Sequence, residues 1–297
     1  MVSSHRILHL SDTHATANAN GVNCDEDGVD ALASLDQLLR DCRHLSHLDL
    51  VVVSGDIADD GSAAGCALVR ERIARFAAGH GIPHVYTTGN HDRRPGFTAA
   101  LGTGHRDAQD AETGVLLDGL DDERAAVSMV NGLRVITLDS LVPGSGHGVV
   151  SRAQLDALAG ILRDPAPAGT LLALHHPPVY TASSPWTIGA GLRNRDELAA
   201  AIAGSDVVAV LCGHFHLQLT GRLGAATVWA TPGVVTRIDL TAPPSVVRAV
   251  HGASATVVDL GGPFAPSFQL LHARDPQVGE QVYLVDPVTW QPATEEP

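Results

Sequence analysis

The amino-acid sequence predicts an α/β fold, because segments typical of strands and of helices alternate along its first two-thirds. Apolar, β-branched runs such as residues 50–53 are typical of strands buried on both faces. Leucines recur at helical spacing between Leu32 and Cys42. The 297 residues are 44% hydrophobic, which suffices for one large core or two small ones. We therefore expect a largely parallel sheet with functional residues beyond the carboxyl ends of its strands.

The expected elements follow one another in a regular order. Strands are expected at residues 6–10, 50–53, 84–87, 125–130, 133–138, 170–174 and 207–211, and helices at 32–42, 69–76, 155–162 and 195–203. Asn131-Gly132 predicts the tight turn of a hairpin, and Ser151 is a typical helix N-cap. The Gly- and Asp-rich stretch 93–124 and the loop 177–192 are expected to be less regular, and short strands follow residue 216.

The charge of the chain restricts its partners and its chemistry. The formal net charge is −14, and all 19 basic residues are arginine. The absence of lysine excludes a P-loop lysine and a Schiff-base lysine. No basic stripe is available to release counterions from DNA or RNA, so a nucleic acid polymer is not an expected partner.

The cysteines and the N-terminus bear on the compartment. Cys24, Cys42, Cys66 and Cys212 lack CxxC spacing, so we expect buried, reduced thiols and a cytoplasmic protein. Residues 1–10 lack the pattern of a signal peptide. No stretch approaches the roughly 20 apolar residues needed to span a bilayer, so no transmembrane segment is expected.

Five short polar segments each end an apolar, strand-like run. They are Ser11-Asp12-Thr13-His14, Ser54-Gly55-Asp56, Thr88-Gly89-Asn90-His91-Asp92, Leu174-His175-His176-Pro177 and Cys212-Gly213-His214-Phe215-His216. Each supplies carboxylate, amide or imidazole groups. Because strand ends can converge in space, we expect these groups to form one metal site.

The spacing within the segments suggests which side chains share a face. Asp12 and His14 lie two apart, as do His214 and His216, so on a strand each pair points to one side. His176 then alternates away from His175 and is expected in the core or behind the ligands. Carboxylate and imidazole together suit Mn, Fe, Co or Zn better than Ca or Mg.

Asp56 and Asn90 complete the ligand types. Gly55 permits close approach to Asp56, whose carboxylate could bridge two ions, although an Asx-turn or a helix N-cap is the alternative. The neutral amide of Asn90 suits a site that already carries anionic ligands. His91 would point near the metals without needing to bind them.

These motifs resemble the full motif set of the calcineurin-like metallophosphoesterases. Within that superfamily, residues 174–178 and 140–144 and the overall spacing are most similar to bacterial class III cyclic nucleotide phosphodiesterases. The resemblance covers about residues 5–240. It implies a four-layer α/β/β/α sandwich of two mixed sheets flanked by helices. We expect a catalytic domain at residues 1–240 and a β-rich C-terminal extension at 241–297 that completes or caps the sandwich.

The resemblance also implies roles for individual residues. One metal would take Asp12, His14 and His216, the other Asn90, His175 and His214, and Asp56 would bridge them. His91 would stabilise phosphoryl charge or protonate the leaving alkoxide. Asp59 would orient His91, with simple solvation in a turn as the alternative. Asn90 and His91 are also expected to bind the substrate. His147 is a further expected substrate-binding residue, because it lies in the glycine-rich loop 144–148 and could face the substrate.

The implied cofactor is a pair of divalent or mixed-valence ions, with Mn and Fe favoured and Zn or Co as alternatives. Two divalent ions and two carboxylates leave about +2, a local positive centre that attracts a phosphodiester despite the charge of the whole chain. Ions about 3.5–4 Å apart would generate a bridging hydroxide and clamp the attacking and leaving oxygens.

Departures from other members of the superfamily narrow the substrate. Asp60 stands where protein phosphatases carry a phosphate-gripping arginine, and residues 57–59 offer no tyrosine ligand of the purple acid phosphatase kind. A small phosphodiester fits best, and 3′,5′-cAMP hydrolysed to a nucleoside monophosphate is the leading expectation. The alternatives are 2′,3′-cyclic nucleotides, glycerophosphodiesters or other small phosphodiesters.

Two further expectations concern binding. A metal-dependent binding module, served by the segment after Leu240, is an alternative of a different class. The resemblance implies a homodimer, although no apolar stripe in the sequence demonstrates one. Tyr180 and Trp186 in the loop 177–192 could offer an aromatic face to a nucleobase or pack as part of a lid.

Overall fold

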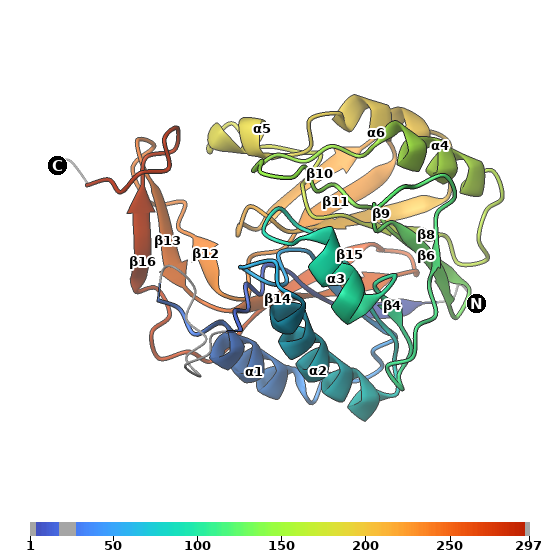
Figure 1. The fold of residues 1–297 in the computed structure, drawn as a ribbon, viewed down its shortest axis with the longest axis horizontal. Helices are drawn as coiled ribbons and strands as arrows, with labels where there is room; N and C mark the ends of the chain where they lie inside the picture. The colour runs from blue at the N-terminus through green and yellow to red at the C-terminus, as the bar shows by residue number, and fades with distance from the viewer. Residues whose placement is uncertain (1–3, 18–27, 295–297) are drawn as a thin grey trace.

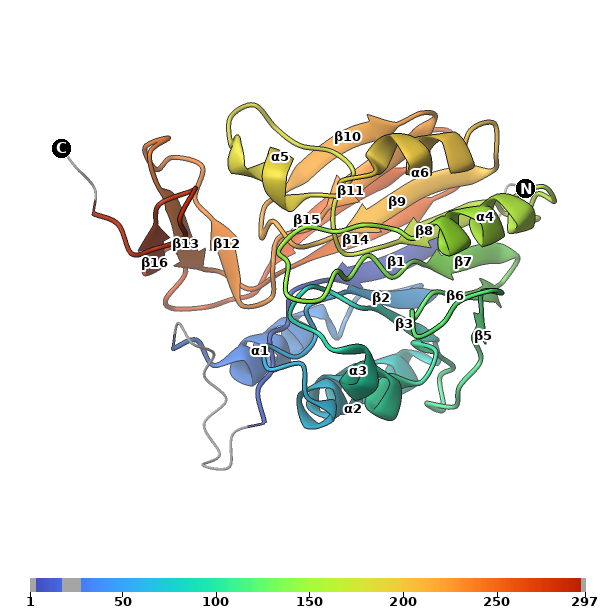
Figure 2. The ribbon, with the colours of Figure 1, turned by 45° about the horizontal axis from the view of Figure 1, so that its top comes forward.

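The computed structural model describes residues 4–17 and 28–294 of the chain. Two mixed β-sheets pack face to face, and helices cover the outer face of each sheet (Figures 1 and 2). The expected four-layer α/β/β/α sandwich is confirmed. Each of the two sheets has parallel strands at its centre and antiparallel strands at its edges, so neither is as uniformly parallel as the strand–helix alternation suggests.

The first sheet carries the N-terminal motifs. Its strands are β1 (His5–Leu10), β2 (Leu50–Ser54), β3 (His84–Thr87), β4 (His105–Arg106), β14 (Ser254–Leu260) and β15 (Ser267–His272). They lie in the order β15-β14-β1-β2-β3-β4. β1, β2 and β3 pair in parallel, whereas β4, β14 and β15 pair antiparallel. Parallel pairing brings the segments that follow β1, β2 and β3 to the same edge of the sheet.

Helices α1 (Ala31–Cys42), α2 (Ala63–His80) and α3 (Arg94–Leu101) cover this sheet on its outer face (Figure 1). The side chain of Ser62 caps α2, which ends at Gly81 with a φ of 70° in the left-handed region. α3 lies in the stretch 93–124, which was expected to be irregular because it is rich in Gly and Asp. The helix forms because a proline fits its first turn and Phe97 and Leu101 are buried.

The second sheet carries the later motifs. Its strands are β5 (Val115–Leu116), β6 (Ala126–Val130), β7 (Leu133–Thr137), β8 (Thr170–Ala173), β9 (Val207–Cys212), β10 (Leu219–Leu223) and β11 (Ala226–Ala230). They lie in the order β10-β11-β9-β8-β7-β6-β5, with β7, β8, β9 and β11 parallel. The predicted hairpin is confirmed, with φ of 49° at Asn131 and 88° at Gly132.

Helices α4 (Arg152–Ile161) and α6 (Arg195–Ala201) pack on the outer face of the second sheet (Figure 2). The predicted N-cap is confirmed, because Ser151 accepts a hydrogen bond from the backbone N–H of Gln154. The loop expected at 177–192 contains a short helix, α5 (Trp186–Ala190). One turn of helix is too short to produce a recognisable apolar period.

Three apolar layers hold the sandwich together. Ile7, Leu50 and Val52 point between the sheets, whereas the alternate residues Val51 and Val53 point toward the helices of the first sheet. A separate layer lies between the second sheet and α4 and α6. The β-branched run at 50–53 is therefore buried on both faces, as its sequence predicts.

A small third sheet lies beside one end of the sandwich (Figure 1). It consists of β12 (Thr236–Ile238), β13 (Val247–His251) and β16 (Gln281–Val285) in the order β12-β13-β16. The chain after residue 240 thus contributes β14 and β15 to the first sheet and β13 and β16 to the third. Its strands extend the sandwich and also form a separate wall beside it.

Cys42, Cys66 and Cys212 are buried free thiols, as predicted. Burial raises the pKa of the Cys42 thiol to about 12. Cys24 lies outside the described residues. Within residues 4–17 and 28–294, none of the helices has the length and apolar character required to cross a bilayer.

Candidate dinuclear metal centre

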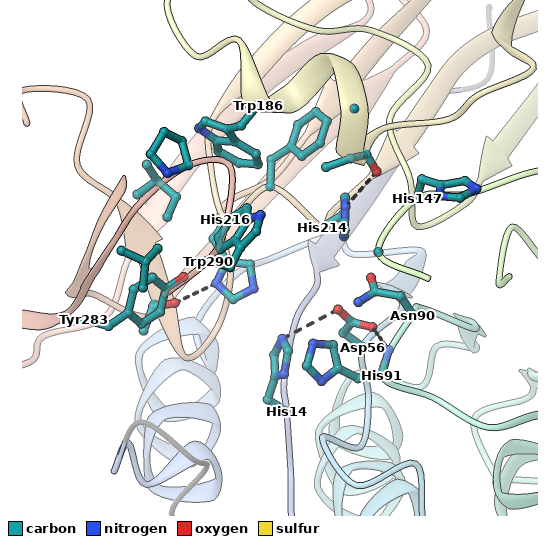
Figure 3. A pocket seen from close by; sticks show the side chains of 18 of the residues that line it. His14, Asp56, Asn90, His91, His147, Trp186, His214, His216, Tyr283 and Trp290 are labelled. Carbon is teal, nitrogen blue, oxygen red and sulfur yellow. Dashed lines mark hydrogen bonds and ion pairs between the residues drawn. The ribbon is translucent and has the colours of Figure 1, made fainter. Parts of the chain in front are cut away.

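The five polar segments converge at one edge of the sandwich, as the sequence predicts. They follow β1, β2, β3, β8 and β9 and meet at a pocket of about 820 Å³ (Figure 3). Its polar lining includes His14, Asp56, Asp59, Asn90, His91, His147, His214, His216 and Thr236. Asp12 and His175 are fully buried behind it. All the sequence-predicted site residues are therefore gathered in one place.

The backbone at the candidate ligands differs from the sequence-based prediction. Asp12, His14, Asp56, His214 and His216 have φ values of 57°, 43°, 48°, 69° and 49°, all in the left-handed region. β1 ends at Leu10 and β9 ends at Cys212, so the expectation that these pairs share a strand face is wrong. Non-glycine residues in this region are strained, and such strain clusters at functional sites.

Two glycines allow candidate ligand side chains to lie close against the backbone. A Cβ at Gly55, where φ is 92°, would overlap the imidazole ring of His175. A Cβ at Gly213 would overlap the Ser11 hydroxyl and the Asp12 carboxylate. These two glycines therefore let the turns after β2 and β9 press directly against ligand side chains.

The first group of candidate ligands consists of Asp12, His14 and His216. Nε2 of His216 lies 3.4 Å from Oδ1 of Asp12, and Nε2 of His14 lies 4.0 Å from the same oxygen. The opposite nitrogen of each ring is held by the protein. Nδ1 of His216 lies 2.6 Å from Oγ1 of Thr236, and Nδ1 of His14 lies 2.8 Å from Oδ1 of Asp59. Nε2 of His14 is buried and has no hydrogen-bond partner among the described residues, as expected of a metal ligand.

The second group contains His175, Asn90 and His214. Nε2 of His175 lies 3.2 Å from Oδ1 of Asn90, and its Nδ1 donates to the carbonyl oxygen of Ser54 at 2.7 Å. Nε2 of His214 donates to the carbonyl oxygen of Ala190 at 3.0 Å, which leaves Nδ1 as the nitrogen that can bind a metal. Anchoring one ring nitrogen in this way fixes the tautomer and aims the other.

Asp56 lies between the two groups. Its Oδ2 lies 3.0 Å from Nε2 of His175 and 3.8 Å from Nε2 of His14, and its Oδ1 accepts the backbone N–H of His91 at 2.8 Å. The turn is held by buried Asp92, which accepts backbone N–H groups of Ile57, Ala58 and Gly89. The residues present therefore fit two ions that share one carboxylate.

His176 lies closer to the ligands than predicted. Atoms of its ring, of His175 and of His214 lie within 4.8 Å of one another, so His176 does not alternate away from His175. The alternation fails because β8 ends at Ala173. His176 is nevertheless fully buried and does not line the pocket, as expected of a residue in the core or behind the ligands. Nδ1 of His176 lies 2.8 Å from Oγ of Ser140, and its Nε2 is buried without a partner among the described residues.

Asp59 contacts two histidines. Its Oδ1 lies 2.8 Å from Nδ1 of His14 and 3.0 Å from Nδ1 of His91. Burial raises the pKa of the Asp59 carboxyl, but hydrogen bonds from both rings outweigh burial and hold that pKa well below its usual range. Burial lowers the pKa of His91, and the charges of Asp56 and Asp59 outweigh it and raise that pKa. Divalent ions in the site would oppose this rise by repelling an imidazolium.

Two of the candidate ligands, Asp12 and His214, have the ionisation that metal binding requires. Burial raises the pKa of Asp12, but nearby His216 and His175 outweigh it and lower that pKa to about 2. Burial and neighbouring His175 lower the pKa of His214 to about 3. At neutral pH the carboxylate is therefore charged and the imidazole of His214 is neutral, as ligands must be. Burial lowers the pKa of His175, but the charge and hydrogen bond of Asp56 outweigh it and raise that pKa to about 9, so a bound ion would have to displace this proton.

The remaining lining includes two residues considered from the sequence, His147 and Trp186, and others that were missed. His147 lines the pocket, with its Nδ1 2.7 Å from Oγ of Ser145. Trp186 lines it as well, whereas Tyr180 is exposed and faces the guanidinium of Arg195. Tyr283 and Trp290 also line it. No motif marks them in the sequence, because they reach the site only through the folding of the third sheet.

A two-sheet α/β sandwich that gathers imidazole, carboxylate and amide groups at its strand ends is typical of dinuclear metallohydrolases. The chain belongs to the calcineurin-like phosphoesterase family, whose model matches residues 5–218. Members of this family use a dinuclear metal centre, and the clusters of His and Asp described above provide its ligand types.

The chain is similar to cyclic nucleotide phosphodiesterases. It is 33% identical over 247 residues to a cAMP/cGMP dual specificity phosphodiesterase of Mycobacterium tuberculosis, covering 83% of this chain and 73% of the relative. It is 34% identical over 229 residues to the 3′,5′-cyclic adenosine monophosphate phosphodiesterase CpdA of Escherichia coli, covering 76% and 75%. The predicted family and subfamily are confirmed.

Among solved structures, a dimetal phosphatase from Danio rerio aligns with a TM-score of 0.58 at 16% identity, covering 91% of this chain and 99% of that chain. A purple acid phosphatase from yellow lupin aligns with a TM-score of 0.57 at 12% identity, covering 99% of this chain and 53% of that chain. These likenesses support the fold.

Proposed function

We propose that this enzyme hydrolyses 3′,5′-cyclic nucleotides, and 3′,5′-cAMP in particular, to nucleoside monophosphates. The observation that carries the proposal is the set of four imidazoles, His14, His175, His214 and His216, each anchored through one ring nitrogen. They surround the carboxylates of Asp12 and Asp56. The names of the relatives from Mycobacterium tuberculosis and Escherichia coli supply the substrate class.

In this proposal Asp12, His14 and His216 hold one ion, Asn90, His175 and His214 hold the other, and Asp56 bridges them. Mn and Fe suit this mixed N/O donor set, with Zn and Co as alternatives. When bound, two such ions supply Lewis acidity for the phosphoryl oxygens and an activated water as the nucleophile. Asn90 and His147 would contact the phosphodiester from the polar side of the pocket.

His91 is the proposed proton donor. Its side chain is 42% exposed on the pocket, and Asp59 holds its Nδ1 at 3.0 Å. Nε2 is therefore the nitrogen available to the substrate. A proton held there can pass to the leaving ribose oxygen as the P–O bond breaks. Asp59 positions the ring of His91, and it also holds His14, which is a proposed metal ligand.

We further propose that residues 1–240 form the catalytic domain and that 241–297 complete or cap the sandwich. The free thiols of Cys42, Cys66 and Cys212 support action in the reducing cytoplasm. The resemblance to class III phosphodiesterases supports a homodimer, and the acidic net charge supports a small substrate over a nucleic acid polymer.

Measurement of kcat/KM with Mn²⁺ for 3′,5′-cAMP, 2′,3′-cAMP, a glycerophosphodiester and bis(p-nitrophenyl) phosphate tests the substrate. The proposal predicts the highest value for 3′,5′-cAMP. Efficient turnover of a glycerophosphodiester without turnover of 3′,5′-cAMP would refute the proposal that cyclic nucleotides are the substrates. No turnover of any of the four compounds would favour a binding module.

A further inference from the structure

One side of the metal pocket is built from aromatic side chains. Trp186 of α5, Phe215, Tyr283 of β16 and Trp290 line it, and we refer to these four residues as the aromatic wall. Figure 3 shows Trp186, Trp290 and Tyr283 on one side of the pocket and Asp56, Asn90 and His91 on the other. The pocket thus has a polar, ligand-bearing side and an aromatic side.

The aromatic wall is continuous with the metal ligands. The rings of Trp186 and Phe215 meet edge to face, with centroids 5.4 Å apart, and Trp186 meets Trp290 in the same way at 5.6 Å. Phe215 is 1% exposed, and its ring lies 5.3 Å from that of His214. A chain of ring contacts therefore leads from a metal ligand to Trp290.

A hydrogen-bonded turn holds Trp290 in place. Its backbone N–H donates to the carbonyl oxygen of Asp286 at 2.9 Å, and Oδ1 of Asp286 accepts the backbone N–H groups of Val288 and Thr289. Trp290 has a φ of 56° and remains 47% exposed. A large indole kept partly in water on a left-handed residue is costly, which suggests that the face serves a ligand.

Apart from Thr236, whose Oγ1 lies against Nδ1 of His216, the rest of the lining near the aromatic wall is apolar. Its members include Pro185, Val235, Ile238, Val285, Pro287 and Val288. Among the described residues that line the pocket, the carboxylates are those of Asp56 and Asp59, and no arginine is present. This side of the pocket therefore offers a flat apolar surface and few groups that could form hydrogen bonds with the edge of a ligand.

We propose that the aromatic wall binds the base of the nucleotide by stacking on Trp290, while the polar side holds the phosphodiester. This inference rests on the proposed cyclic nucleotide activity and adds the residues that select for a base. A pocket of about 820 Å³ is large enough for both parts of a nucleotide. Stacking on an indole favours purines and tolerates both adenine and guanine, because each has a π-face.

The test compares 3′,5′-cAMP with an analogue that has no base, 1-deoxyribose 3′,5′-cyclic phosphate. We expect Trp290→Ala to lower the ratio of kcat/KM for cAMP to that for the analogue about tenfold, mainly through KM. Trp290→Phe should restore most of the ratio. Phe264→Ala is the matched control, because Phe264 is 90% exposed and does not line the pocket.

Tryptophan fluorescence provides a readout independent of turnover. The three tryptophans are Trp186, Trp229 and Trp290. Trp229 is buried, and its ring stacks on that of Phe268 with the centroids 4.7 Å apart. We expect AMP to quench the fluorescence of the metal-loaded protein more than ribose 5-phosphate does, and Trp290→Phe to remove most of the difference.

Equal ratios in Trp290→Ala and the parent enzyme, or equal quenching by AMP and ribose 5-phosphate, would overturn the base-stacking proposal. These outcomes differ from failure of the proposed activity. If the proposed activity is wrong, the parent enzyme will hydrolyse neither cyclic phosphate. Selective quenching by AMP would then still decide whether the aromatic wall binds a base.

Discussion

Oδ1 of Asp59 lies 2.8 Å from Nδ1 of His14. The same oxygen lies 3.0 Å from Nδ1 of His91. One carboxylate thus positions both a proposed metal ligand and the proposed proton donor. The alternative raised by the sequence, a solvated turn residue, does not describe a side chain that is only 14% exposed.

This shared contact predicts a double effect for Asp59→Asn. Metal affinity should fall about 10- to 100-fold, as is typical when a partner of a ligating histidine is lost, and kcat should fall as well. Isothermal titration with Mn²⁺ and steady-state kinetics measure the two effects. Asp60→Asn is the matched control. It removes a neighbouring charge, but Oδ1 of Asp60 accepts a hydrogen bond from the backbone N–H of Ser62 and not from a histidine. Equal metal affinity in the two variants would contradict the role of Asp59.

Thr236 of β12 should support the metal site from a distant part of the chain. Thr236→Val keeps the shape of the side chain but removes the oxygen that lies 2.6 Å from Nδ1 of His216. We expect Mn²⁺ to bind about tenfold more weakly. Thr236→Ser should restore binding, and Thr241→Val on the surface should have no effect. Unchanged Mn²⁺ affinity in Thr236→Val would show that His216 does not depend on this contact.

Gly55 should tolerate no side chain. Gly55→Ala forces a Cβ into the ring of His175 at a residue with a φ of 92°. Gly119→Ala separates the steric clash from the cost of a positive φ. Gly119 has a φ of 78°, but among the described residues no atom lies within 4 Å of an added Cβ. We expect a loss of about 1 kcal/mol in the free energy of unfolding for Gly119→Ala and a clearly larger loss for Gly55→Ala. Urea denaturation measures both, and similar losses would refute the clash.

Stability should fall in mild acid because of buried histidines away from the metal site. Burial lowers the pKa of His105 from 6.5 to about 3, and its nitrogens bond to Ser128 and Thr137. The folded state therefore resists a proton that the unfolded chain accepts, so this contribution is complete above pH 6.5 and is lost as pH falls toward 3.

The expected slope is up to about 1.4 kcal/mol per pH unit for His105. Urea denaturation across this pH window should show a smaller slope for His105→Gln than for the parent protein. His44→Gln, at an exposed site, should leave the slope unchanged. An unchanged slope in His105→Gln would contradict the assignment.

The sequence was sufficient to predict the sandwich and the convergence of the five polar segments. Both follow from local patterns, because β-branched runs such as residues 50–53 predict buried parallel strands whose ends meet at one edge. It could not predict the positive φ values at Asp12 or His214, since strand alternation gives no sign of where a strand stops.

The supporting contacts were also beyond sequence reasoning. His214 is anchored by the carbonyl oxygen of Ala190 and His216 by Thr236, and neither partner belongs to a motif. Trp290 reaches the pocket because β16 pairs with β13 in the third sheet. Such positions depend on tertiary packing, which local propensity does not specify.

The central claim is that two ions, held in part by Asn90, drive the hydrolysis. The most direct test is the rate of 3′,5′-cAMP hydrolysis by Asn90→Ala loaded with Mn²⁺, measured beside the parent enzyme, with circular dichroism to establish that both are folded. We predict a loss of at least about 100-fold with an unchanged spectrum. Full turnover by the folded variant would contradict the dinuclear mechanism.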